Sequence, residues 1–368
     1  MSNYTEDHFF QENEYKVTKD GPTKTPPIYY GSLNDAFYNY FKTVKNNKNT
    51  YHLLLDFNNV KTNSFDLHNL DSAVFAILGF HRFFELLLKD ILRRIDPFLS
   101  VKFPDKEKEA IRFLNKDLDY EEMETVEFKK AFERFKEALK YSNENPDNTK
   151  YAIAQKFSFL RDDNTLERLS SWRNRIMHNG STLPNFHLLD YLISQKVIPL
   201  VDAVIKAEKD ILKGYLPIYF ETSTGIKIID EIIKIKIDYK DYQVESKKDD
   251  LIRKVLRLAH LKELGRAAYT LDVTLNNNIS FYNPYYHDPI SRYSRCAEQE
   301  KSHESFYALK KCPCCGFDTL VVYRLGDSID KKEFISWFEC FTCTYSVKNN
   351  IGDPELFGFS KEKLFATE

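Results

Sequence analysis

The sequence is poor in glycine, and this scarcity already narrows the fold. Only 11 of its 368 residues are Gly, whereas glycine makes up about 7% of a typical protein. Hairpin-rich β proteins and phosphate-binding loops both depend on glycine, so we expect neither here. An excess of one charge is also missing, because 53 Lys and Arg residues face 55 Asp and Glu residues, for a formal net charge of −2. Any nucleic-acid-binding surface must therefore be a local patch.

Long apolar runs are absent as well. The longest apolar stretches are interrupted by Asp, Glu or Lys within a turn or two, so none is expected to span a bilayer. The first residues, MSNYTEDHFFQENEYKV, are polar and acidic and lack the apolar segment of a signal peptide. Hydrophobic residues nevertheless make up 42% of the chain, which is a globular composition. These features predict a cytoplasmic protein without a membrane partner.

Apolar residues at spacings of three and four predict a mainly α fold. A long helix is expected from Asp71 to the stop at Pro97, and its apolar stripe is broad enough for the centre of a bundle. Four substantial helices with short connections indicate a helical bundle. The other expected helices lie at 120–142, from about Asp163 to His178, and from Pro184 to near Gly214.

The remaining segments give weaker patterns. Residues 1–31 are expected to be irregular, and alternating Ile residues between Ile218 and Tyr242 predict two strands or a short ribbon. Residues 270–310 show little periodicity. Further elements are expected as a helix opened by Ser32, a strand at Tyr51–Phe57, a short helix after Pro104 and a helix over Asp249–Thr270.

All six cysteines lie at or after Cys296, which suggests a metal site rather than a disulfide framework. Two C-x-x-C pairs are separated by 24 residues, 316–339, that contain plausible strands. Two such turns joined by a β-ribbon would place four thiolates around one Zn²⁺, in a closed site with a structural role. The first turn, CPCCG, resembles that of zinc ribbons, although Cys314 leaves its ligand pair open, and free, redox-active or iron–sulfur cysteines are the alternatives. The predicted ligands are Cys312, Cys315, Cys340 and Cys343, with Cys296 as a spare thiol.

The segment LERLSSWRNRIMHNG carries the most informative chemistry. Arg173 and His178 are five residues apart, about 140° around a straight helix, and Asn174 follows the arginine. RNA cleavage without a metal needs a group that exchanges protons near neutral pH and a fixed positive charge for the phosphorane. Histidine and arginine supply these two functions. One histidine does not easily serve as base and acid in one step, so we hypothesise a symmetric dimer in which a second chain completes the site.

The same motif resembles the signature of the HEPN superfamily, an R-x4–6-H pattern with a polar residue after the arginine, late in a helical bundle. The match is RNRIMH, and the long first helix with FELLLKDIL is also similar. The resemblance covers roughly residues 65–215. It implies a metal-independent endoribonuclease acting as a dimer on RNA, commonly as a toxin or an effector of antiviral defence. Other members of the superfamily are inactive modules.

We accordingly expect four segments: a lead-in at 1–64, a HEPN-like bundle at 65–215, an α+β connection at 216–305 and a zinc ribbon at 306–368. The catalytic candidates are Arg173, Asn174 and His178. The alternatives are a non-catalytic module that binds RNA, a nucleotide or a protein partner, and a zinc-ribbon DNA-binding or scaffold protein.

Four other residues are weaker candidates. Arg253 and His260 fit R-x6-H, but a solvated helix face explains that pair better. Glu85 is a candidate accessory residue, because first helices of the superfamily often carry an acidic residue facing the motif. His81 is expected to be a packed helix residue. A regulatory protein partner is conceivable for a toxic nuclease.

Overall fold

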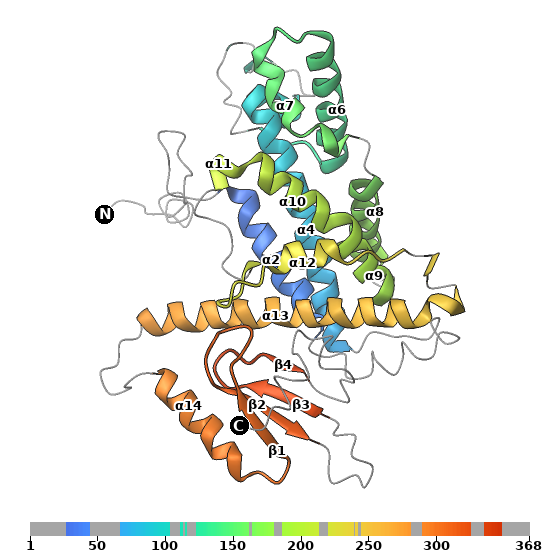
Figure 1. The fold of residues 1–368 in the computed structure, drawn as a ribbon. Helices are drawn as coiled ribbons and strands as arrows, with labels where there is room; N and C mark the ends of the chain where they lie inside the picture. The colour runs from blue at the N-terminus through green and yellow to red at the C-terminus, as the bar shows by residue number, and fades with distance from the viewer. Residues whose placement is uncertain are drawn as a thin grey trace, which may run out of the picture.

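The structure is a computed structural model of the full chain, in which helices dominate and one small sheet lies at the C-terminal end (Figure 1). It describes residues 27–44, 67–103, 111–112, 115, 123–161, 164–179, 186–212, 220–238, 240–241, 244–280, 289–324 and 335–347. The expected strand at Tyr51–Phe57 and nearly all of the helix expected after Pro104 lie outside these residues. Within the described ranges, no helix combines the length and apolar character needed to cross a membrane.

Helix α4 (Leu67–Ile95) is the centre of the bundle, as its broad apolar stripe predicts. It contacts α2 (Ile28–Lys42), α6 (Phe128–Glu144), α7 (Ala152–Lys156) and α8 (Asn164–Asn179). Helix α2 begins at Ile28, directly after Pro27, so the expectation of an irregular segment up to residue 31 is wrong at its end. Pro27 fixes its own φ and suits a position just outside a helix start.

Two of the few glycines lie where other helices meet α2. A Cβ on Gly79 of α4 would lie 2.9 Å from the Cα of Ala36, and a Cβ on Gly265 would lie 2.5 Å from the ring of Phe41. Both distances are below any ordinary carbon–carbon contact, so only glycine allows these approaches. Glycine is thus used here for helix packing.

After α8 the chain runs through α9 (Phe186–Leu192), a π-helical turn (Ile193–Val197) and α10 (Ile198–Ala207) to the short α11 (Lys209–Leu212). The π turn precedes Pro199, which has no N–H to donate to the preceding turn. This succession confirms the helical segment expected between Pro184 and Gly214. Glu208, which is 1% exposed, accepts hydrogen bonds from Arg94 of α4 at 3.0 and 2.9 Å and from the hydroxyl of Tyr29 of α2 at 3.2 Å. That cluster ties three helices together.

The strands expected between Ile218 and Tyr242 are wrong for most of this segment. Ile228–Lys234 is a helix, α12, and Ile228, Ile229 and Ile232 face the core at helical spacing. The extended parts are an isolated antiparallel bridge between Glu221 and Lys227 and the stretch after α12, where Ile235 and Ile237 are buried with period two. The backbone N–H of Ile237 donates to Oε1 of Gln195 at 3.1 Å rather than to a neighbouring strand.

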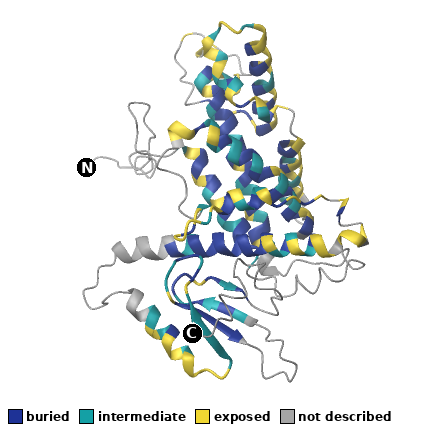
Figure 2. Ribbon diagram, in the orientation of Figure 1, coloured by how far each residue is buried: buried dark blue, intermediate teal, exposed yellow. Residues whose placement is uncertain are grey.

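Helix α13 (Lys248–Ser280) lies across the end of the bundle, with the sheet on its other side (Figure 1). Its middle part, residues 258–268, is buried all round, as the continuous dark blue stretch in Figure 2 shows. A helix covered on all sides is a central element. It confirms and extends the helix expected over Asp249–Thr270.

The strands of the described sheet are antiparallel and lie side by side in the order of the sequence. We call residues 312–315 the first cysteine turn and residues 340–346 the second. Leu320 pairs with Cys340, so the strand that follows the first cysteine turn lies beside the start of the second. Because residues 270–310 show little periodicity, α14 (Pro289–Gln299) was not predicted from the sequence. Pro289 at the first position of this helix is a helix-start signal. The strands are β1 (Phe306–Lys310), β2 (Leu320–Arg324), β3 (Ile335–Cys340) and β4 (Ser346–Val347).

One continuous hydrophobic core extends from α2 and α4 to the cysteines, and a small second cluster lies on the sheet around Val321 and Tyr323. The mainly α architecture, the helical bundle and the small C-terminal sheet with its cysteines are therefore confirmed. The division at residues 64, 215 and 305 stays a prediction.

Candidate functional site

The Arg173–His178 motif lies in the second half of α8. Arg173 is half-buried, whereas Asn174 and His178 are exposed. Nη1 of Arg173 donates to Oδ1 of Asn174 at 3.0 Å, so the polar residue after the arginine fixes the guanidinium. The opposite face of the helix is apolar and holds the motif outward. Its anchoring side chains are Leu166, Leu169, Trp172 and Ile176.

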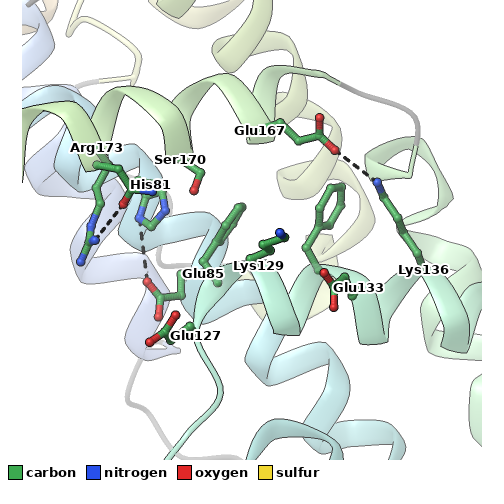
Figure 3. Close-up of a pocket in the computed structure, with 12 residues that line it drawn as sticks. His81, Glu85, Glu127, Lys129, Glu133, Lys136, Glu167, Ser170 and Arg173 are labelled. Atoms are coloured by element: carbon green, nitrogen blue, oxygen red, sulfur yellow. Dashed lines mark hydrogen bonds and ion pairs between the residues drawn. The ribbon is translucent and has the colours of Figure 1, made fainter.

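A pocket of about 630 Å³ opens beside the motif, between α4, α6 and α8 (Figure 3). Arg173 and Asn174 form part of its wall, but His178 does not line it. The structure therefore brings two of the three predicted residues into the pocket and leaves the third on the exposed end of the same helix. A site formed by one chain alone would pair Arg173 with a different histidine.

That histidine is His81 of α4, which lies beside Arg173 at one end of the pocket (Figure 3). It is 5% exposed and its ring packs against Phe128 at 4.7 Å between centroids. Burial lowers the pKa of His81 to about 4, Glu85 opposes this shift, and Arg173 and Lys89 add to it. His81 is thus neutral at pH 7, and its Nε2 has no hydrogen-bond partner among the described residues. It is the packed residue that the sequence predicts, and it also lines the pocket.

Glu85 connects His81 to a chain of polar contacts. Its Oε2 lies 3.8 Å from Nδ1 of His81, and its Oε1 accepts a hydrogen bond from Nζ of Lys89 at 2.7 Å. Lys89 in turn donates to the hydroxyl of Thr125 at 3.1 Å. The predicted accessory carboxylate therefore lines the same pocket as Arg173.

The rest of the pocket carries mixed charge. Lys136 and Glu167 approach to 3.5 Å at the other end (Figure 3). Four carboxylates outnumber three cations, so the pocket itself is slightly acidic. Sequence reasoning missed the contribution of α6, because only the packing of α6 against α4 brings its polar face here. The lining charges are Glu85, Glu127, Glu133, Glu167, Lys129, Lys136 and Arg173.

The four predicted cysteine ligands meet in one cluster whose sulfur atoms all lie within 4.8 Å of one another. Sγ of Cys312 is 3.6 Å from Sγ of Cys343, and Sγ of Cys315 is 3.6 Å from Sγ of Cys340. A tetrahedral ion bound to sulfur at about 2.3 Å requires sulfurs about 3.8 Å apart. All four side chains are buried, so the cluster fits a closed metal site.

The structure also settles the position of Cys314. Cys314 is not one of the four clustered residues, and its Sγ lies 3.8 Å from the carbonyl oxygen of Leu264 on α13. Its own carbonyl accepts a hydrogen bond from the backbone N–H of Ser223 at 2.9 Å. Cys314 thus fixes the first cysteine turn to α13 and to the loop before α12.

Helix α13 also holds the second cysteine turn. Nη2 of Arg266 donates to the carbonyl of Thr344 at 2.6 Å, and Oε1 of Glu263 accepts from the N–H of Ser346 at 3.0 Å. Arg266 and Glu263 form an ion pair with 5% exposure on each side. Thr344 has a φ of 59°, a left-handed conformation that non-glycine residues seldom adopt.

The two residues of the second R-x6-H pair line the same pocket beside α12 but differ in burial. Arg253 is exposed, whereas His260 is 6% exposed and its Nδ1 lies 2.9 Å from the hydroxyl of Tyr345. Burial lowers the pKa of His260 to about 3. The interpretation of both residues as a solvated face is therefore wrong for His260, whose role is to pack against the cysteine turn.

Comparisons with protein-family models, with curated proteins and with solved structures gave no match. The functional argument therefore depends on the geometry of the chain itself.

Proposed function

We propose that the protein is a metal-independent endoribonuclease of the HEPN type, a cytoplasmic toxin or antiviral effector that acts on RNA as a homodimer. The observation that carries this proposal is the placement of Arg173, Asn174 and His178 in the second half of α8, where Nη1 of Arg173 donates to Oδ1 of Asn174 at 3.0 Å. Arg173 is half-buried at the pocket, Asn174 and His178 are exposed, and Met177 next to His178 is 57% exposed. In the proposed dimer the second chain covers Met177 and places its own histidine beside His178.

In this proposal the 2′-hydroxyl of RNA attacks the adjacent phosphorus. The O2′–P bond forms, the P–O5′ bond breaks, and the product is a 2′,3′-cyclic phosphate with a free 5′-hydroxyl. His178 accepts the proton from the 2′-hydroxyl, and His178 of the partner subunit gives a proton to the departing 5′-oxygen. Arg173, fixed by Asn174, balances the charge on the phosphorane.

The four-cysteine cluster takes no part in this reaction. We propose that it holds Zn²⁺, because four thiolates at tetrahedral spacing are the typical ligand set of a structural zinc. A closed set of four protein ligands leaves no position for a substrate. Its contribution is the attachment of the sheet to α13.

The test is RNA cleavage by the purified full-length chain in the presence of EDTA. Wild type should cut tRNA, mRNA or rRNA into products that end in 2′,3′-cyclic phosphate. Arg173→Ala and His178→Ala should each lose about a hundredfold or more in rate, the typical loss on removing a group that stabilises a transition state. Arg175→Ala is the matched control, since Arg175 is exposed on the same helix and stacks over the Trp172 ring at 5.3 Å. Equal, negligible cleavage by wild type and both variants would contradict the proposal.

A specific observation favours a second candidate, a non-catalytic module for a protein partner. The pocket beside Arg173 is slightly acidic, which disfavours a polyanion and suits a basic peptide. In that case expression in cells would be harmless, RNA would stay intact, and Arg173→Ala would affect only partner binding.

A further inference from the structure

A second pocket lies at the junction of α12, the first half of α13 and the first cysteine turn, and Arg173, Asn174 and His178 do not line it. Its volume is about 710 Å³, within the range of small-molecule sites. Gly225 and Ile226 close one side, α13 supplies the longest wall, and Pro313 of the cysteine turn closes another. Three separate stretches of the chain thus build one hollow.

The pocket is cationic although the chain as a whole is not. Five cations and two carboxylates line it, which leaves an excess of three positive charges. The lining cations are Lys227, Lys234, Arg253, Lys254 and Arg257, and the carboxylates are Asp230 and Glu231. This concentration is the local patch that the near-zero net charge requires of any anion-binding surface.

Several of these charges already have partners. Glu231 pairs with Lys234 and, at 2.7 Å, with Arg257, and the pKa of Glu231 is lowered by these contacts. Lys254 pairs with Asp250 at 2.8 Å.

Two cations from different elements remain without an ion pair within the described part of the chain. They are Lys227, just before α12, and Arg253 of α13. Arg253 is one turn from Arg257 on the same face of α13, so the two guanidinium groups approach the pocket together. Positively charged side chains that line a pocket and have no carboxylate partner are suited to binding phosphate.

The floor of the pocket is apolar. Ile226, Leu261 and Leu264 contribute aliphatic surface, and Pro313 adds a flat ring face. Thr224 donates its hydroxyl to the carbonyl of Pro313, which holds that wall in place. A ligand that matches this lining carries phosphate at one end and a flat, weakly polar group at the other.

We propose that this pocket binds a nucleoside di- or triphosphate. Lys227, Arg253 and Arg257 contact the phosphates, the base lies on the apolar floor, and Asp230 is available to a ribose hydroxyl. The proposed ligand is a single nucleotide rather than a strand of RNA, because the exposed Asp249 in the first turn of α13 would repel a phosphate backbone that continued in that direction.

The site is tested by isothermal titration calorimetry, in which the full-length chain is titrated with ATP and, separately, with GTP. Saturable binding is expected, and Lys227→Glu and Arg253→Glu should each weaken it by about tenfold, since a charge-assisted hydrogen bond contributes about 1.4 kcal/mol or more. The charge-matched controls are the single variants Lys140→Glu and Arg168→Glu, with both sites exposed and distant in sequence. Circular dichroism checks that all variants fold.

Three outcomes would overturn the proposal. One is no saturable binding of ATP, ADP or GTP up to about 1 mM, the weak limit of specific recognition. Another is binding that Lys227→Glu and Arg253→Glu leave unchanged. The third is binding of a uridine decamer, but not of ATP, that both variants abolish. Arg173→Ala should bind ATP like wild type, so loss of RNA cleavage and loss of nucleotide binding are separately detectable.

Discussion

His81 provides the most quantitative prediction, a loss of folding stability in acid. In the unfolded chain a histidine titrates near pH 6.5, whereas burial lowers the pKa of His81 in the folded chain to about 4. Between these values the unfolded state binds the additional proton. The free energy of unfolding therefore falls as the pH falls through this window and is fully retained above it.

The magnitude follows from the width of the window. Each pKa unit corresponds to about 1.4 kcal/mol, so His81 alone should cost about 2 kcal/mol between pH 7 and pH 5 and about 3 kcal/mol by pH 4. Burial lowers the pKa of His187 too, and that of His260 to about 3. Both histidines therefore also lower the free energy of unfolding in acid, and wild type should lose more stability than His81 alone accounts for.

The share of His81 is isolated by substitution. Urea unfolding of wild type and His81→Gln at pH 7, 6 and 5 should show a shallower decline for the variant by about 2 kcal/mol over this range. His81→Phe is a second variant, because a ring at this position keeps the contact with Phe128. His178→Gln is the control, since His178 is exposed, and it should follow wild type. If His81→Gln declines as steeply as wild type, the assignment of His81 as a buried neutral imidazole is refuted.

Three further predictions concern the core, the surface and the metal. Lys262, with 0% exposure, donates to Asp190 at 2.7 Å, so Lys262→Met should cost about 3–5 kcal/mol in urea unfolding by leaving a buried charge. Lys262→Met/Asp190→Leu should recover most of this loss, and failure to recover it would contradict a charge-based cost. Met177→Glu should convert a dimer to a monomer in sedimentation experiments and reduce RNA cleavage, because an unpaired carboxylate cannot be buried in an interface. Met177→Leu should do neither. An unchanged oligomer in Met177→Glu would count against the composite site. Elemental analysis should find no bound zinc in Cys315→Ser, because a closed site needs all its thiolates. Cys296→Ser should retain the zinc. Zinc retained in Cys315→Ser would mean a different ligand set.

The sequence predicts the helices well where one periodicity dominates. The α8 helix was expected from about Asp163 and runs from Asn164 to Asn179. The helix expected over 120–142 begins only at Phe128, because residues before it pair with the segment after α4: the N–H of Lys102 donates to the carbonyl of Glu124 at 2.7 Å. Such a pairing between distant segments has no local sequence signal.

The isoleucine-rich segment fails for a different reason. β-branched residues favour strands, and the alternation at Ile235 and Ile237 is indeed extended. Ile228, Ile229 and Ile232 carry a helical spacing within the same run. Two periods that overlap in a short apolar run are hard to separate from sequence alone.

The cysteine cluster and the pocket beside Arg173 also differ in how far the sequence predicts them. The C-x-x-C pairs predict their cluster because each pair is local and one strand register, Leu320 with Cys340, brings the pairs together. The pocket beside Arg173 combines α4, α6 and α8, and a polar face on one helix does not specify which helix it will oppose. His81 was therefore expected only as a packed residue, without its place next to the arginine.

Helix α13 explains how the parts of this protein depend on one another. Lys262 joins it to α9, the helix that follows the Arg173 motif, and Arg266 joins it to the second cysteine turn. Arg253 and Arg257, on the same helix, line the cationic pocket, whose remaining wall includes Pro313 of the first cysteine turn. Disruption of the cysteine cluster would affect the turns that carry Pro313 and the Arg266 contact, whereas no residue of these turns lines the pocket between α4, α6 and α8. The cysteine cluster therefore supports the cationic pocket directly and the Arg173 motif only through α13.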